Sequence, residues 1–156
     1  MLKRFSSFCL LSLFFLCVFA GYLPAEDDIA TQRSCSYCGM DRKAYGYSRM
    51  VVSYEDGKSA GVCSLHCAVT DLQSAGERKV KALLVADRDT RTMIDATKAV
   101  WVIGGRKKGV MTQRPKWAFA TKAGAEAFIA GYGGTLTDWQ TAFAAAKEDA
   151  AQQSRR

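Results

Sequence analysis

Two parts of the chain show the same order of secondary-structure signals, and this repeat restricts the fold more than any other feature. In the first part, residues 48–54 and 59–62 are typical of strands. Between them lies Glu55-Asp56-Gly57-Lys58, in which the Asp-Gly pair favours a tight hairpin turn. A helix over 65–73, preceded by Ser64 as N-cap, and a third strand over 80–87 complete a predicted β-β-α-β unit.

The second part repeats this order with little sequence similarity. Thr121 is a suitable N-cap for its helix, and Gly133-Gly134 ends it. A last helix is predicted to start at Thr137 or Asp138. Before it, strands are predicted over 99–103, 110–112 and 116–120, with a turn over 104–109. The helix capped by Thr121 is predicted over 122–131.

These signals predict an α+β fold in which two β-β-α units of similar length form one domain with an internal repeat, followed by a C-terminal helix. A length of 156 residues suits one domain with a sizeable core. A charged fraction of 24% with 11% aromatic residues argues against a disordered chain. We expect a polar, flexible linker over 26–34, the folded domain over 35–150 and a polar tail over 151–156.

The N-terminal segment 1–25 has the pattern of a secretory signal peptide. Lys3 and Arg4 precede an uncharged apolar run from 8 to 20, which is shorter than the roughly 20 residues that span a bilayer. Cleavage after Ala20 or after Ala25 fits equally well. The sequence therefore predicts an exported, periplasmic protein, with membrane association only if this segment stays uncleaved.

Cys17 does not make a convincing lipoprotein cleavage site, because the bulky Phe15 and Leu16 precede it where a small residue is needed. The formal net charge is +7, but the basic residues are scattered and are not interleaved with aromatic side chains. Their best cluster lies in the predicted turn 104–109. We therefore expect neither lipid anchoring at Cys17 nor a nucleic-acid partner.

Sulfur ligands gather in two short motifs of the mature chain. Cys35-Ser-Tyr-Cys38-Gly-Met40 places two thiols and a thioether within six residues. The spacing lets Cys35 and Cys38 chelate one ion or form a disulfide. Cys63-Ser-Leu-His66-Cys67 adds two thiols and the single histidine at the expected start of a helix, where amide dipoles stabilise a thiolate.

Four interpretations of these motifs compete. Disulfides are expected for cysteines of an exported protein, although a domain of this size hardly needs them. The spacing also permits a tetrahedral zinc site or a thiol–disulfide oxidoreductase. The mixture of thiolate and thioether favours Cu(I), with Met40 or Met111 as thioether, whereas Met93 is most simply a core residue. Chemistry alone leaves zinc and disulfides open.

An ordered set of motifs resembles the NosL family, the accessory copper proteins of nitrous oxide reductase maturation. The similarity covers about residues 33 to 143. Its motifs are Cys-x-x-Cys-Gly-Met from Cys35, Tyr-Glu-Asp-Gly from Tyr54, Val-Ala-Asp from Val85, Trp-Val-Ile-Gly-Gly from Trp101, Gly-Val-Met-Thr from Gly109 with Ala118-Phe119, and Ala-Glu-Ala-Phe from Ala125 with Gly133-Gly134.

The resemblance implies two β-β-α-β-like units related in fold to organomercurial lyase, and a non-enzymatic Cu(I) chaperone. Its partners would be a copper donor and a copper-accepting metalloenzyme such as nitrous oxide reductase, in denitrification. The resemblance also implies four candidate copper ligands, which are Cys35, Cys38, Met40 and Met111.

The second sulfur motif departs from the general family pattern. Many relatives are lipoproteins, whereas the residues before Cys17 make a poor lipoprotein cleavage site here. Cys63, His66 and Cys67 are therefore candidate extra ligands of the same site or of a second one. The alternatives are a thiol–disulfide oxidoreductase and a structural zinc domain with four cysteine ligands. Organomercurial cleavage would need a carboxylate beside the thiols, and Asp41 is the nearest in sequence.

Overall fold

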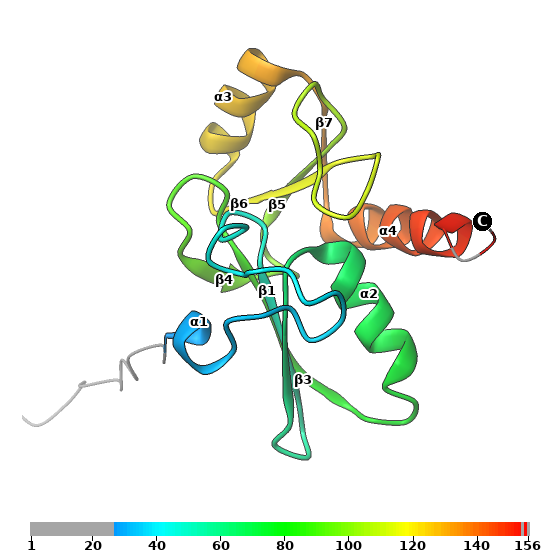
Figure 1. Cartoon of the computed structure of the whole chain (residues 1–156). Helices are drawn as coiled ribbons and strands as arrows, with labels where there is room; N and C mark the ends of the chain where they lie inside the picture. Colours follow the sequence, from blue (N-terminus) through cyan, green and yellow to red (C-terminus); the bar gives the residue numbers. More distant parts are fainter. Residues whose placement is uncertain (1–26, 154, 156) are drawn as a thin grey trace, which may run out of the picture.

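The computed structural model describes residues 27–153 and 155, so the predicted signal peptide lies outside the described residues. Two antiparallel sheets and helices form an α+β fold (Figure 1), as expected for this class. The larger sheet has the strand order β2-β1-β3-β4 and the smaller one β6-β5-β7. The elements are α1 (Asp28–Thr31), β1 (Met50–Tyr54), β2 (Ser59–Val62), α2 (Leu65–Ser74), β3 (Val80–Ala86), β4 (Met93–Asp95), β5 (Val100–Ile103), β6 (Lys116–Phe119), α3 (Lys122–Tyr132), β7 (Thr135–Thr137) and α4 (Trp139–Gln153).

The two units share one arrangement of strands. In each, the first strand lies in the centre and pairs antiparallel with the second strand and with the strand that follows the helix. This gives β1-β2-α2-β3 in the first unit and β5-β6-α3-β7 in the second. The common strand order makes the internal repeat visible although the two sequences have diverged.

Three local predictions differ from the structure. The three-residue strands β4 and β7 are too short to show alternation in the sequence, and pairing with β3 and β5 creates them. Residues 110–112 do not form the expected strand, since Met111 has a φ of 57°. Ser64 stands at the N-cap of α2, but its side chain makes no capping hydrogen bond there. Thr121, by contrast, caps α3 through a bond from the Gly124 amide.

The hydrophobic core has a larger and a smaller part, and β5 contributes to both. Successive strand residues point to opposite faces, so buried Trp101 joins the larger part and buried Val102 the smaller one. The larger part fills the space between the four-stranded sheet, α2 and α4. Small residues on α4, such as Ala142 and Ala146, allow α2 to pack closely against it, as Figure 1 shows.

A buried ion-pair cluster connects the N-terminal segment to this core. Arg42 is fully buried, and its guanidinium donates to the Asp28 carboxylate at 2.6 Å and to the carbonyls of Val62 and Met50. Arg49 also binds the Asp28 carboxylate, at 2.9 Å. Helix α1 and its ion pairs thus occupy the segment expected to be a flexible linker.

Gly61 in β2 makes room for this cluster. A Cβ atom at position 61 would lie 2.6 Å or less from the Arg42 guanidinium and the Gln32 side chain. The close approach explains why a strand interior carries glycine at this point. No helix between residues 27 and 153 has both the length and the apolar character needed to cross a membrane.

A candidate metal centre of four cysteines

The two sulfur motifs meet in a single cluster. The Sγ atoms of Cys35, Cys38, Cys63 and Cys67 all lie within 4.8 Å of one another. The Cys63 sulfur is 3.5 Å from that of Cys38 and 3.6 Å from that of Cys67. All four are free thiols in the structure. Residues that the sequence places in two separate motifs therefore form one candidate site.

The loop that carries Cys35 and Cys38 is closed by its own backbone and attached to β2. The Cys35 amide donates to the Met40 carbonyl at 2.8 Å, and the Gly39 amide donates to the Cys35 carbonyl at 2.9 Å. Gly39 has a φ of 75°, a left-handed conformation that glycine adopts without strain. The Ser36 amide and hydroxyl both donate to the Gly61 carbonyl, which holds the loop beside the strand that leads to Cys63.

Cys63 and Cys67 lie on either side of the start of α2. Cys63 follows the last residue of β2, and its carbonyl accepts a hydrogen bond of 2.8 Å from the Ser48 hydroxyl. Cys67 is four residues further on, in the first turn of the helix. A spacing of about one helical turn brings both sulfurs to the same side, so the strand-to-helix junction presents them together.

The cluster is buried except on one side. Cys63 and Cys67 are fully buried and Cys35 is 3% exposed, whereas Cys38 is only half-buried. Tyr37, which precedes Cys38 in the loop, is 53% exposed. The Cys38 side of the loop is thus the side on which another molecule could reach a sulfur ligand.

Interactions between the thiols shift their pKa values in opposite directions. The thiols of Cys63 and Cys67 donate to the Cys35 sulfur and lower the pKa of Cys35 strongly. The same bonds raise the pKa of Cys63 to about 12 and raise that of Cys67 as well. Metal ions bind cysteine as the thiolate, so capture of an ion by this cluster releases thiol protons.

The spacing of the sulfurs fits one metal ion. Tetrahedral coordination with metal–sulfur bonds of about 2.3 Å separates the sulfurs by about 3.8 Å. The observed separations of 3.5 and 3.6 Å are close to this value. Thiolates suit both Cu(I) and zinc, so the cluster can hold one soft ion.

His66 lies apart from this group. It is buried on α2, and its Nδ1 atom has no hydrogen-bond partner in the described part of the chain. Burial lowers the pKa of His66, and nearby Lys116 lowers it further while Asp149 opposes this effect. Adjacent helical residues point about 100° apart, which explains why His66 faces these charges while Cys67 faces the sulfurs.

The two candidate methionines differ in their surroundings. Met40 is half-buried and packs against the core that contains Cys35, Cys63 and Cys67. Met111 is 36% exposed, in a loop, and has left-handed backbone geometry. Such a conformation is uncommon for a residue other than glycine and tends to occur at functional sites.

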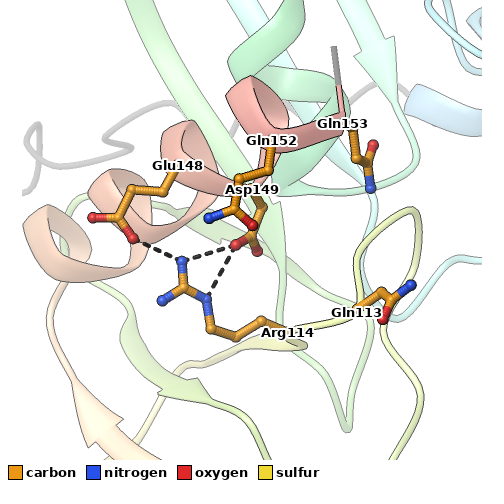
Figure 2. A pocket seen from close by; sticks show the side chains of 6 residues that line it. All are labelled: Gln113, Arg114, Glu148, Asp149, Gln152 and Gln153. Carbon is orange, nitrogen blue, oxygen red and sulfur yellow. Dashed lines mark hydrogen bonds and ion pairs between the residues drawn. The ribbon is translucent and has the colours of Figure 1, made fainter. Parts of the chain in front are cut away.

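Helix α4 holds the Met111 loop through polar bonds that the sequence motifs did not indicate. Asp149 accepts hydrogen bonds from the Thr112 hydroxyl, from the Arg114 guanidinium and from Lys116 at 2.5 Å. Figure 2 shows Arg114 between Glu148 and Asp149, at a hollow of about 330 Å³. Burial opposes ionisation of Asp149, but these donors outweigh it and lower its pKa. The sequence gives no signal for these ion pairs, because Arg114, Lys116 and Asp149 cannot be told from ordinary surface residues without the structure.

The substitution Asp149→Asn should destabilise the protein, because it leaves the ammonium group of Lys116 buried with no carboxylate beside it. We expect the free energy of unfolding to fall by about 2 kcal/mol in urea titrations. Glu148→Gln is the matched control and should cost less than about 0.5 kcal/mol, since Glu148 is exposed. Adding Lys116→Met to Asp149→Asn should recover stability, and failure to do so would contradict the role given to Lys116.

Comparisons with known proteins agree with the arrangement of strands and helices. The model of the NosL family matches residues 26–145, most of the chain. The crystal structure of the copper chaperone NosL from Shewanella denitrificans is similar in fold, with a TM-score of 0.56 and 24% sequence identity. The similarity covers 70% of this chain and 88% of the Shewanella chain. No curated protein matches the sequence. By the extent of the family match, the chain belongs to the NosL family.

Proposed function

We propose that the protein is an exported, non-enzymatic chaperone whose cargo is Cu(I), held by the four-cysteine cluster. The observation that carries this proposal is the convergence of Cys35, Cys38, Cys63 and Cys67 within 4.8 Å, since thiolates are soft ligands that select Cu(I). Membership of the NosL family supports it, as does the copper chaperone role named for the Shewanella protein of similar fold.

The one-sided exposure of the cluster supports release of the cargo. A ligand of an acceptor protein can approach the ion beside Cys38, the only half-buried thiol of the four. Cu(I) accepts low coordination numbers, so the acceptor's ligand joins as one cysteine leaves, and no chemical catalysis is needed.

Met40 and Met111 are proposed as thioether ligands that capture or pass on the ion. Met40 follows the metal-binding loop and packs at the edge of the same core. Met111 is exposed on a loop held by α4, which itself packs on the cysteine-bearing α2. The acceptor is a copper-dependent metalloenzyme of the periplasm, with nitrous oxide reductase as the partner associated with this family, and a copper donor loads the site.

A second candidate function is a structural zinc site with four cysteine ligands. The observation that favours it is the burial of three of the four sulfurs, because structural zinc sites are closed and fully coordinated. Zinc would then belong to the folded state, and its removal would unfold the protein.

Metal titration under reducing conditions separates the two functions. The reduced protein is titrated with Cu(I) in competition with a chromophoric chelator, and its unfolding is followed with and without a zinc chelator. A chaperone should compete effectively for one Cu(I) per chain and stay folded without zinc. Failure to outcompete a weak Cu(I) chelator would refute copper carriage, and loss of circular dichroism on zinc removal would establish the structural site.

A further inference from the structure

A cationic cavity lies at the junction of the two units, and none of the four clustered cysteines lines it. It has a volume of about 350 Å³. Its walls come from the segment before β1, the β3–β4 loop, the β5–β6 loop and strand β6. The lining residues are Tyr47, Arg88, Asp89, Arg91, Lys107, Lys108 and Trp117. Junctions between units are common places for ligand sites.

Positive charge in this cavity is mostly uncompensated. Asp89 is the single acidic residue of the lining and binds Arg88 at 2.6 Å. Arg91, Lys107 and Lys108 have no ion-pair partner among residues 27–153. Three cations that share one hollow repel each other, and a multiply charged anion relieves that repulsion better than a single carboxylate does.

Two hydrogen-bond donors of the lining residues lack partners. Trp117 is 3% exposed, and its indole Nε1 bonds to no acceptor within the described chain. The Nε atom of Arg88 is likewise buried and unpaired there. Most buried donors in proteins have partners, so two unpaired donors on residues that line one cavity are an unusual feature of this region.

Aromatic rings and backbone geometry hold the cations around the hollow. The Arg88 guanidinium lies 5.1 Å from the Phe128 ring centroid, and the Lys107 ammonium lies 4.5 Å from that of Tyr132. Arg91 has a φ of 62°, and its carbonyl accepts from the Arg49 side chain at 3.0 Å. Positions fixed in this way make a formed site, unlike mobile lysines on an open surface.

We propose that this cavity binds a phosphate-class oxyanion, either free or as the phosphate group of a larger molecule. Arg88 and Arg91 offer planar donor groups that suit phosphate oxygens, and Lys107 and Lys108 add point charges. The proposal is independent of copper carriage, because none of these residues belongs to the cysteine cluster.

Calorimetric titration of the full protein with inorganic phosphate, at constant ionic strength, tests the proposal. The double variant Arg91→Gln/Lys108→Gln should bind phosphate about tenfold more weakly. The matched control Lys79→Gln/Lys81→Gln removes the same charge from exposed positions on and before β3 and should bind as the unmodified protein does. Equal weakening in both double variants would mean diffuse attraction, and no phosphate binding by the unmodified protein would overturn the site.

Four further probes identify the source of the anion. Glycerol 1-phosphate and phosphatidylglycerol vesicles are compared with inorganic phosphate, and phosphatidylcholine vesicles serve as the neutral reference. If the protein binds phosphatidylglycerol vesicles and glycerol 1-phosphate competes with this binding, the site is supported and its anion is a lipid headgroup. Binding of an oligoaspartate peptide without binding of phosphate would overturn the proposal in favour of an acidic protein partner.

Discussion

The double substitution Cys35→Ser/Cys38→Ser should abolish tight Cu(I) binding. It removes two of the four sulfurs that lie within 4.8 Å of one another. Loss of groups that merely orient metal ligands already costs about 10- to 100-fold in affinity, so loss of two ligands should exceed about 100-fold. Competition with a chromophoric Cu(I) chelator measures the effect, and circular dichroism checks that the variant is folded.

Two control substitutions make this result specific. Met93→Leu removes a sulfur from β4 while keeping apolar volume, and it should leave the Cu(I) affinity unchanged. His66→Gln should also leave it unchanged, because the structure places His66 near Lys116 and Asp149 and outside the sulfur group. A loss with His66→Gln as large as that of the double cysteine variant would show that the imidazole is a ligand.

The second large effect is expected for Asp28→Asn. This carboxylate pairs with Arg42, whose side chain is fully buried, and with Arg49, whose side chain is 9% exposed. Removing its charge leaves two guanidinium groups uncompensated in the interior. Breaking buried pairs of this kind costs about 3 to 4 kcal/mol of unfolding free energy. Urea unfolding at pH 7 measures the loss, and Glu77→Gln, an exposed carboxylate without an ion pair in residues 27–153, is the control.

The same pair predicts how this stability depends on pH. Burial opposes ionisation of Asp28, but hydrogen bonds and charges from Arg49 and Arg42 outweigh it and lower its pKa below 3.8. A group with a lowered folded-state pKa stabilises the protein above its unfolded-state pKa and loses this effect as the pH falls through its folded-state pKa. The difference between the unmodified protein and Asp28→Asn should therefore be full at neutral pH and shrink below about pH 4. A constant difference down to pH 2 would contradict the assignment.

Strong periodicity and turn chemistry made most of the fold predictable. The hairpin of β1 and β2 follows from two strand-like segments on either side of Asp56-Gly57, and α3 begins after the predicted cap Thr121. The strands β4 and β7 were missed because three residues carry no pattern of their own. The composition of residues 110–112 favours a strand, but Gln153 and Asp149 of α4 hold their loop in another conformation.

The sequence alone thus determined the α+β class, the order of the longer strands and helices, and the two sulfur motifs with their soft-ligand chemistry. Only the tertiary structure decided that Cys35, Cys38, Cys63 and Cys67 meet, because the first motif is attached to β2 through Gly61 while the second lies just after that strand. The same packing separated His66 from Cys67 and paired Asp28 with Arg42. Local pattern fixes which residues form a helix or strand, but distances between motifs depend on how those elements pack.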